Sequence, residues 1–293
     1  MSLLFYTAAD RGYWHYAPLY AFFTLRSNRD ALLEIALEDA EEFRARYAPL
    51  MDKLQALYGD RLLVRNIDFA DRIPGVVRFV EEPRRKSEAE NVYIGDVDIL
   101  IFDPDVEAQH LGFMSEFDLP FSNKIRPRAE GDVGPRLTGL HFAPMDLQYP
   151  LPDLSDLDLS SDNRAKGYDE TVLWEIMNRK GVMIPPKEVF NRRPEHGLHL
   201  SGHRHPFGRR KDGNPLVFDF QEMKEKRQSV GWSGIHKPQY RDAYREAVAS
   251  AEFRELYFDL PIRARTILTA LDAIVGEEFG QFCLDVSVFT PEG

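Results

Sequence analysis

The first 200 residues alternate predicted strands with predicted helices. Apolar runs at 3–6, 31–37 and 61–67 have the length of buried strands, and amphipathic helical patterns at 17–26 and 40–58 separate them. This alternation predicts an α/β fold built on a mainly parallel sheet. Ligands of such sheets bind at the carboxyl ends of the strands, so the loops that follow strands are the places to search for a site.

The rest of the chain is predicted in shorter pieces. The stretch 148–163 is rich in Pro, Asp and Ser, which is typical of a loop, and 208–228 has the composition of an exposed connection. Further strands are predicted at 92–94, 99–102, 137–142 and 198–200, and further helices at 76–82, 169–179, 240–257 and 262–275.

Composition excludes several classes of protein. The 20 Phe, 12 Tyr and 3 Trp exclude a disordered chain, and a net charge of −11 argues against non-specific binding of nucleic acid. The single cysteine, Cys283, excludes an intrachain disulfide and favours a reducing compartment. No apolar run of membrane-spanning length and no secretory signal is found, so we expect a cytoplasmic protein with at most peripheral membrane contact.

Two acids interrupt an apolar stretch in NVYIGDVDILIF. Asp96 and Asp98 are two residues apart, so their carboxylates can point to one side of an extended segment and hold Mn²⁺ or Mg²⁺ against a diphosphate. The alternative is a simple turn, because Asp-x-Asp also occurs at 103–105 and 156–158. The apolar surroundings favour a cation, since buried acids need a partner.

A second candidate segment is GLHLSGHRHPF at 197–207. His199 ends a short strand pattern and offers an imidazole that suits Mn²⁺, while Gly202 allows close approach of a phosphate and Arg204 adds positive charge. The alternative is a surface loop with incidental histidines. A structural zinc site is not expected, because the spacing differs from zinc fingers and no cysteine is nearby.

Taken in order, YTAADRGYWHY at 6–16, VYIGDVDILIFD at 92–103, YDETVLWEIMNRKGVMIP at 168–185 and HLSGHRHPF at 199–207 resemble the motifs of retaining glycosyltransferases of family 8. The resemblance implies a GT-A, Rossmann-type mixed sheet flanked by helices. It implies a nucleotide-sugar-binding catalytic domain over 1–207 and a helical C-terminal extension over 208–293 that shapes the acceptor side.

The resemblance also implies roles for individual residues. Matching positions place Ala8, Asp10 and Tyr13 at the nucleotide base. They place Asp96 at the ribose and the metal, Asp98 and His199 on the metal, and Arg78 beside the Asp pair. Gly202 would contact the diphosphate, and Asp169 would bind hydroxyls of the donor sugar. The segment RLTGLHF at 136–142 would lie where donor and acceptor meet.

Three positions depart from the family pattern. His205 and Phe207 stand where the family has a diphosphate-binding Lys and a Trp, so Lys237 or Arg204 would have to supply the missing charge. Glu170 replaces a Gln beside the anomeric carbon. It could stabilise the transition state or act as nucleophile, or it could simply favour the N-terminus of a helix.

The expected activity is metal-dependent transfer of a sugar from a nucleotide-diphosphate sugar, most simply a UDP-sugar, to a glycan or glycolipid, with retention, in bacterial surface polysaccharide synthesis. The alternatives are an inverting GT-A enzyme with Asp169 or Glu170 as base, a catalytically silent nucleotide-sugar-binding scaffold, and a nucleotidyltransferase, for which AADRGYW at 8–14 is a poor phosphate loop. We expect a locally positive cleft near Arg78 and Arg204. We also expect His199→Ala to weaken activation by Mn²⁺ strongly and His196→Ala to do little.

Overall fold

The computed structural model describes residues 2–126, 136–163, 167–182, 193–200 and 238–279. Its centre is a five-stranded sheet in the order β3-β2-β1-β4-β8. The strands of this sheet are β1 Leu3–Ala9, β2 Leu32–Glu38, β3 Leu62–Ile67, β4 Asn91–Ile94 and β8 His141–Pro144. The predicted α/β class with a mainly parallel sheet is confirmed, since β1 to β4 are parallel and only the edge strand β8 is antiparallel.

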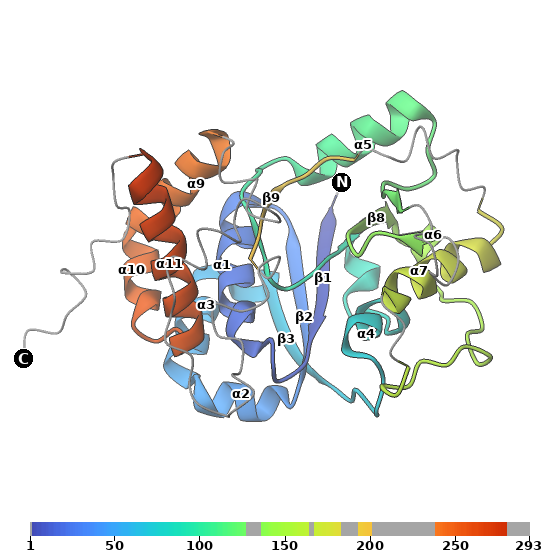
Figure 1. Cartoon of the computed structure of the whole chain (residues 1–293), viewed down its shortest axis with the longest axis horizontal. Coiled ribbons are helices and arrows are strands. Elements are labelled where there is room, and N and C mark those ends of the chain that lie inside the picture. Colours follow the sequence, from blue (N-terminus) through green and yellow to red (C-terminus); the bar gives the residue numbers. More distant parts are fainter. Residues whose placement is uncertain (1, 127–135, 164–166, 183–192, 201–237, 280–293) are drawn as a thin grey trace, which may run out of the picture.

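Strand β1 lies in the middle of the sheet, and every one of its residues is buried. Its sequence LLFYTAA is a continuous apolar run rather than an alternating one, as is typical of a parallel strand covered on both faces. Helices cover both faces: α1 and α3 lie on one side and α4 and α7 on the other (Figure 1). The helices of this part are η1 Trp14–Tyr16, α1 Ala17–Ser27, α2 Ala40–Arg46, α3 Ala48–Tyr58, α4 Pro74–Val80, α5 Val106–Phe117, α6 Met145–Gln148 and α7 Tyr168–Arg179, with short 3-10 turns at Gly59–Arg61 and Lys86–Glu88.

Two small antiparallel pairs lie outside the main sheet. Strand β5, Ile99–Ile101, pairs with β9, Gly197–His199, and β6, Ile125–Arg126, pairs with β7, Arg136–Leu137. The β5–β9 pair brings together segments that are about 100 residues apart in the sequence, and it therefore determines where His199 lies.

The described part of the C-terminal segment, 238–279, is helical, as expected. It forms α9 Pro238–Ala249, α10 Ala251–Tyr257 and α11 Ile262–Phe279, which lie outside α1 and α3 (Figure 1). Aromatic side chains join the two layers: Phe253 packs on Phe22 with ring centroids 5.1 Å apart, and Tyr244 stacks on Phe23. The predicted boundary at 207/208 lies outside the described residues and stays a prediction.

Several predicted elements have different bounds. The single helix predicted over 40–58 is two helices, α2 and α3, because Tyr47 leaves the helical conformation just before the Pro-containing first turn of α3. The helix predicted over 240–257 is likewise divided at Ser250, whose side chain accepts a hydrogen bond from the Phe253 N–H and begins α10. The strand predicted over 137–142 is divided between β7 and β8.

Candidate functional site

The turn between β4 and β5 carries the paired acids to the carboxyl end of the sheet. Gly95 begins this turn, and its backbone is fixed against β1: its N–H donates to the carbonyl of Tyr6 at 3.2 Å, and its carbonyl accepts from the Thr7 hydroxyl at 2.8 Å. Asp96 and Asp98 therefore follow directly after β4, beside the last residues of β1. This is the edge at which a mainly parallel sheet binds ligands.

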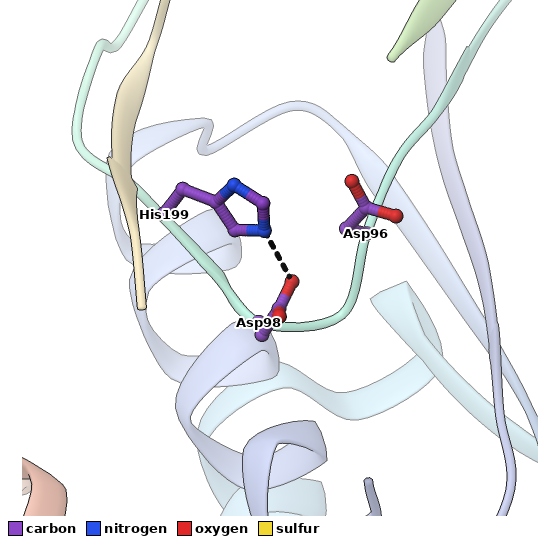
Figure 2. Close-up of side chains that lie close together, drawn as sticks. All are labelled: Asp96, Asp98 and His199. Carbon is purple, nitrogen blue, oxygen red and sulfur yellow. Dashed lines mark ion pairs between the residues drawn. The ribbon is translucent and has the colours of Figure 1, made fainter. Parts of the chain in front are cut away.

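Strand β9 brings His199 to the same turn. Ile99 pairs with His199 in the β5–β9 register, and the N–H of Leu200 donates to the carbonyl of Asp98 at 2.7 Å. As a result the Nε2 of His199 lies 3.1 Å from the Oδ1 of Asp98, the contact marked in Figure 2. One ligand atom from each of Asp96, Asp98 and His199 lies within 4.8 Å of the other two, which is the grouping that the sequence predicted for a metal.

The electrostatics of this group follow from its burial. The Asp98 side chain is 3% exposed and that of Asp96 28%. Burial together with the charge of Asp98 raises the pKa of Asp96, and the guanidinium of Arg78 opposes that rise. Burial would lower the pKa of His199, but its hydrogen bond to Asp98 and the charges of both acids outweigh that effect and raise the pKa to about 9. The imidazole thus attracts both carboxylates in a partly buried site.

Arg78 connects the acidic turn to α7. Its Nη2 lies 2.8 Å from the Oδ1 of Asp96 and 3.2 Å from the Oδ2 of Asp169, in the first turn of α7. The two charges keep Arg78 cationic although its side chain is only 8% exposed, and its guanidinium carbon lies 4.6 Å from the ring centroid of Phe79. The expected position of Arg78 beside the Asp pair is thus observed.

These side chains line a cavity of about 410 Å³. Its lining comes from the ends of β1 and β4, from α4 and α7, and from β9: Ala8, Ala9, Asp10, Tyr13, Pro74, Gly75, Arg78, Asp96, Val97, Asp98, Asp169 and His199. Among these described residues the ionisable side chains are mainly acidic, with four carboxylates against Arg78 and His199. A positive cleft was expected, and the described part of the cavity is instead suited to a cation.

At the other end of the cavity, Asp10 and Tyr13 form a tight turn. The N–H of Tyr13 donates to the Oδ1 of Asp10 at 3.1 Å, and the Tyr13 ring is 40% exposed. Burial raises the pKa of Asp10. Tyr13 and Ala8 both line the cavity, and their expected contact with a nucleotide stays a prediction.

Other predicted residues are not placed at the cavity. Glu170 is 8% exposed and lies beside Arg136, with its Oε2 3.6 Å from the Nε of Arg136, and it does not belong to the described lining. The predicted residues Gly202, Arg204 and His205, together with Phe207 and Lys237, lie outside the described residues.

The sequence did not single out two glycines that lie close to the charged side chains of the cavity, Gly75 in its lining and Gly139 beside Arg78. A Cβ on Gly139 would lie 2.8 Å from the Nη2 of Arg78, and one on Gly75 would lie 3.3 Å from the Oδ2 of Asp169. A side chain at position 139 would therefore require Arg78 to shift, whereas one at position 75 would require only a small movement of Asp169. Gly139 belongs to the segment RLTGLHF, but nothing in the spacing of that segment identifies the glycine itself.

The chain matches no protein-family model and no curated protein. Among solved structures it resembles the galactosyltransferase LgtC in complex with donor and acceptor sugar analogs, at 15% identity over 65% of this chain and 69% of that chain, with a TM-score of 0.32. An active-site mutant of LgtC gives 15% identity over 65% of this chain and 68% of that chain, with a TM-score of 0.31. The mannosyltransferase PcManGT from Pyrobaculum calidifontis, in complex with GDP-Man and Mn²⁺, gives 13% identity over 95% of this chain and 78% of that chain, with a TM-score of 0.39. These values assign neither a family nor an activity, so the function proposed below depends on the site.

None of the helices in the described part of the chain is long and apolar enough to cross a membrane.

Proposed function

We propose that this protein is a metal-dependent glycosyltransferase that uses a nucleotide-diphosphate sugar as donor. The observation that carries the proposal is the convergence of Asp96, Asp98 and His199, whose ligand atoms lie within 4.8 Å of one another at the edge of a cavity. The ordered motifs that resemble family 8 glycosyltransferases support the same conclusion, because the matching positions assign these three residues to one metal.

The residues present fit a hard divalent cation. Two carboxylates and an imidazole are donors that suit Mn²⁺, and Mg²⁺ less well, and they leave positions for phosphate oxygens. The four carboxylates of the described lining also outnumber its two basic side chains, Arg78 and His199, so the site has room for further positive charge. A bound Mn²⁺ would neutralise the negative charge that develops on the leaving diphosphate.

The side chains around this group bind and orient the donor. Tyr13 offers an aromatic face for the base, with Ala8 and Asp10 beside it, and Asp169 accepts hydrogen bonds from hydroxyls of the transferred sugar. Arg78 fixes the carboxylates of Asp96 and Asp169 relative to each other, so that the ribose end and the sugar end of the donor are held in one geometry.

The finer assignments rest on the family resemblance. The donor is a UDP-sugar, the acceptor hydroxyl of a glycan or glycolipid attacks the anomeric carbon with retention, and the enzyme takes part in polysaccharide synthesis at the cytoplasmic face of the membrane. The resemblance would also place Glu170 at the anomeric carbon, but its side chain lies beside Arg136 and outside the described lining, so that role requires the side chain to turn toward the donor. Gly202 and Arg204 or His205 contribute to the diphosphate site.

The test is hydrolysis and transfer measured across UDP-, GDP- and CDP-sugars, with and without Mn²⁺. We expect the wild type to consume one donor class only when metal is added. Asp98→Asn removes one anionic ligand and should lower turnover by at least ~100-fold, in line with the loss of a metal ligand. The matched control is Asp105→Asn, an exposed acid of the DPD segment outside the cavity, which should keep wild-type turnover. Metal-independent activity that survives Asp98→Asn would refute the proposal.

A further inference from the structure

A second group of polar side chains is buried beside the cavity and has no part in the site described above. Four side chains form a continuous row: the Oδ2 of Asp103 lies 3.0 Å from the Nδ1 of His196, the Nε2 of His196 lies 2.9 Å from the Nε2 of His110, and the Nδ1 of His110 lies 2.8 Å from the Oγ of Ser122. The two imidazoles and the hydroxyl are at most 3% exposed. We call these four residues the buried relay.

The hydrogens of the buried relay have one consistent arrangement. An ionised Asp103 accepts only, so the Nδ1 of His196 carries the proton and its Nε2 accepts from the Nε2–H of His110. The Nδ1 of His110 is then an acceptor and takes the hydrogen of the Ser122 hydroxyl. Burial lowers the pKa of both histidines, so the neutral rings that this arrangement needs are the forms present at neutral pH.

The buried relay joins four parts of the fold. Asp103 follows β5, His110 is in α5, Ser122 pairs with Phe142 of β8, and His196 directly precedes β9. The backbone of His196 is held as well, because its carbonyl accepts from the N–H groups of Phe102 and Asp103 at 2.8 and 3.2 Å.

A hydroxyl from the C-terminal helices holds the same point. The OH of Tyr240, in α9, donates to the carbonyl of Glu195 and lies 3.3 Å from the Oδ2 of Asp103. The Tyr240 hydroxyl thus holds both the backbone of Glu195, which precedes His196, and the carboxylate of Asp103, which contacts the His196 ring.

Within the described residues, and apart from the bond between the Leu200 N–H and the Asp98 carbonyl and the burial of Leu198, β9 depends on its pairing with β5 and on the bonds at His196. It is three residues long and pairs only with the three-residue β5. His199 is three residues beyond His196, so a strand that is fixed at His196 delivers His199 to Asp98 in a defined position. A strand that is released at that point would carry its imidazole away from the acids.

We propose that the buried relay is a positioning unit that fixes β9 and so presents the imidazole of His199 to Asp96 and Asp98. The inference rests on the proposed metal site and deepens it. It also replaces the expectation that His196 is dispensable, because that histidine is 3% exposed and is bonded on both ring nitrogens. His196 acts through His199 and does not itself touch the metal.

The test measures binding of Mn²⁺ alone by electron paramagnetic resonance, at a temperature well below the unfolding midpoint of every variant. Titration gives the dissociation constant, and pulsed measurements detect the coupling of bound Mn²⁺ to a histidine nitrogen. Loss of stability elsewhere in the fold would move neither quantity, so these readouts separate positioning from a general structural role.

Four variants give the comparison. His196→Leu removes both ring bonds and should weaken Mn²⁺ binding by ~10-fold or more and abolish the nitrogen coupling, as expected for residues that orient a metal ligand. His196→Asn keeps an N–H near the position of Nδ1 for Asp103 and should restore most of the affinity. Tyr240→Phe removes only a hydroxyl, so the chain should fold, and binding should weaken in the same direction as in His196→Leu. Leu54→Ala, in the core contact of α3, should lower the melting temperature and leave Mn²⁺ binding unchanged.

The outcomes are distinguishable. Wild-type affinity and nitrogen coupling in both His196→Leu and Tyr240→Phe would overturn the inference and leave the metal site standing. Mn²⁺ bound to the wild type without any nitrogen coupling would also overturn it, because His199 would then not be a ligand. A wild type that binds no Mn²⁺ would instead refute the proposed function.

Discussion

At Arg78, one buried guanidinium nitrogen contacts two carboxylates of the cavity, those of Asp96 and Asp169. The backbone of Gly139 passes so close that an added methyl group would lie 2.8 Å from that nitrogen. Gly139→Ala should therefore displace Arg78 and lower kcat/KM for the donor by ~10-fold, which corresponds to about 1.4 kcal/mol. Steady-state kinetics of Mn²⁺-dependent donor consumption measure this effect.

Gly112 provides the matched control for that substitution. It lies in α5, on the surface, and an added Cβ would meet no atom within 4 Å. Gly112→Ala should leave kinetics unchanged and raise the free energy of unfolding by about 0.5–1 kcal/mol, because alanine loses less backbone entropy in a helix. Equal kinetic effects of the two substitutions would show that the close approach at Gly139 has no role.

Single residues also show what the sequence could and could not predict. Asp96, Asp98 and His199 could be predicted as candidate metal ligands, because acids in an apolar stretch and a histidine at a strand end stand out locally and the family resemblance groups them. His110 and His196 carried no such signal, since a histidine becomes a buried hydrogen-bonding partner only when tertiary structure brings a second group to it. The same holds for Gly139, whose role depends on the side chain of Arg78 from helix α4.

Among the elements, α5 was missed for a physical reason. Its buried residues are Val106, His110 and Met114, which follow one another at helical spacing along one face. Because the middle position is a histidine, the apolar periodicity is interrupted, and only the partner His196 explains why that position is inside. The parallel core strands were predictable from their continuous apolar runs, whereas the antiparallel β8 and the β5–β9 pair depend on contacts between distant segments.

The β5–β9 pair allows a prediction of its own. The backbones are in such close contact that a Cβ on Gly197 would lie 1.7 Å from the carbonyl oxygen of Leu100. Gly197→Ala should therefore separate the two strands. We expect the free energy of unfolding in urea to fall by about 2–4 kcal/mol, as for other substitutions that introduce a core clash. Mn²⁺ binding should weaken as well, because His199 lies on the displaced strand. A variant with wild-type stability and Mn²⁺ affinity would show that β9 is not held at this point.

At the scale of the whole molecule, the cavity combines five separate parts of the chain. The ends of β1 and β4 supply Asp10, Asp96 and Asp98. Helix α4 supplies Arg78, helix α7 supplies Asp169 and strand β9 supplies His199. Parallel strands place their carboxyl ends on one edge of the sheet, so the contributions of β1 and β4 could be predicted from the sequence. The contributions of α7 and β9 depend on how the chain returns to that edge, and no local pattern encodes this.

The buried histidines also determine how the stability of the whole molecule depends on pH. Burial, together with the charge of Arg193, lowers the pKa of His141 to about 3, and burial lowers those of His110 and His196 as well, although Asp103 opposes the shift at His196. Between the lowered values and the ordinary value of 6.5, the unfolded chain binds more protons than the folded one. The stability that these three histidines contribute is therefore complete above about pH 6.5 and falls as the pH is lowered, by about 1.4 kcal/mol per pH unit for each. His199 acts in the opposite sense, because its raised pKa contributes stability that is lost as the pH rises from about 6.5 to about 9.

Urea unfolding measured at intervals between about pH 5 and pH 8 tests this dependence, in a window above the ordinary pKa values of most carboxylates. His141→Phe keeps an aromatic ring where His141 packs against Phe121, with centroids 5.1 Å apart, and removes one titrating group. This variant should show a shallower loss of stability below pH 6.5, smaller by about 1.4 kcal/mol per pH unit, because one fewer proton is taken up on unfolding. Stability that is flat from about pH 5 to pH 7 in the wild type would contradict the prediction, because the three rings would then take up protons as readily in the folded protein as in the unfolded chain.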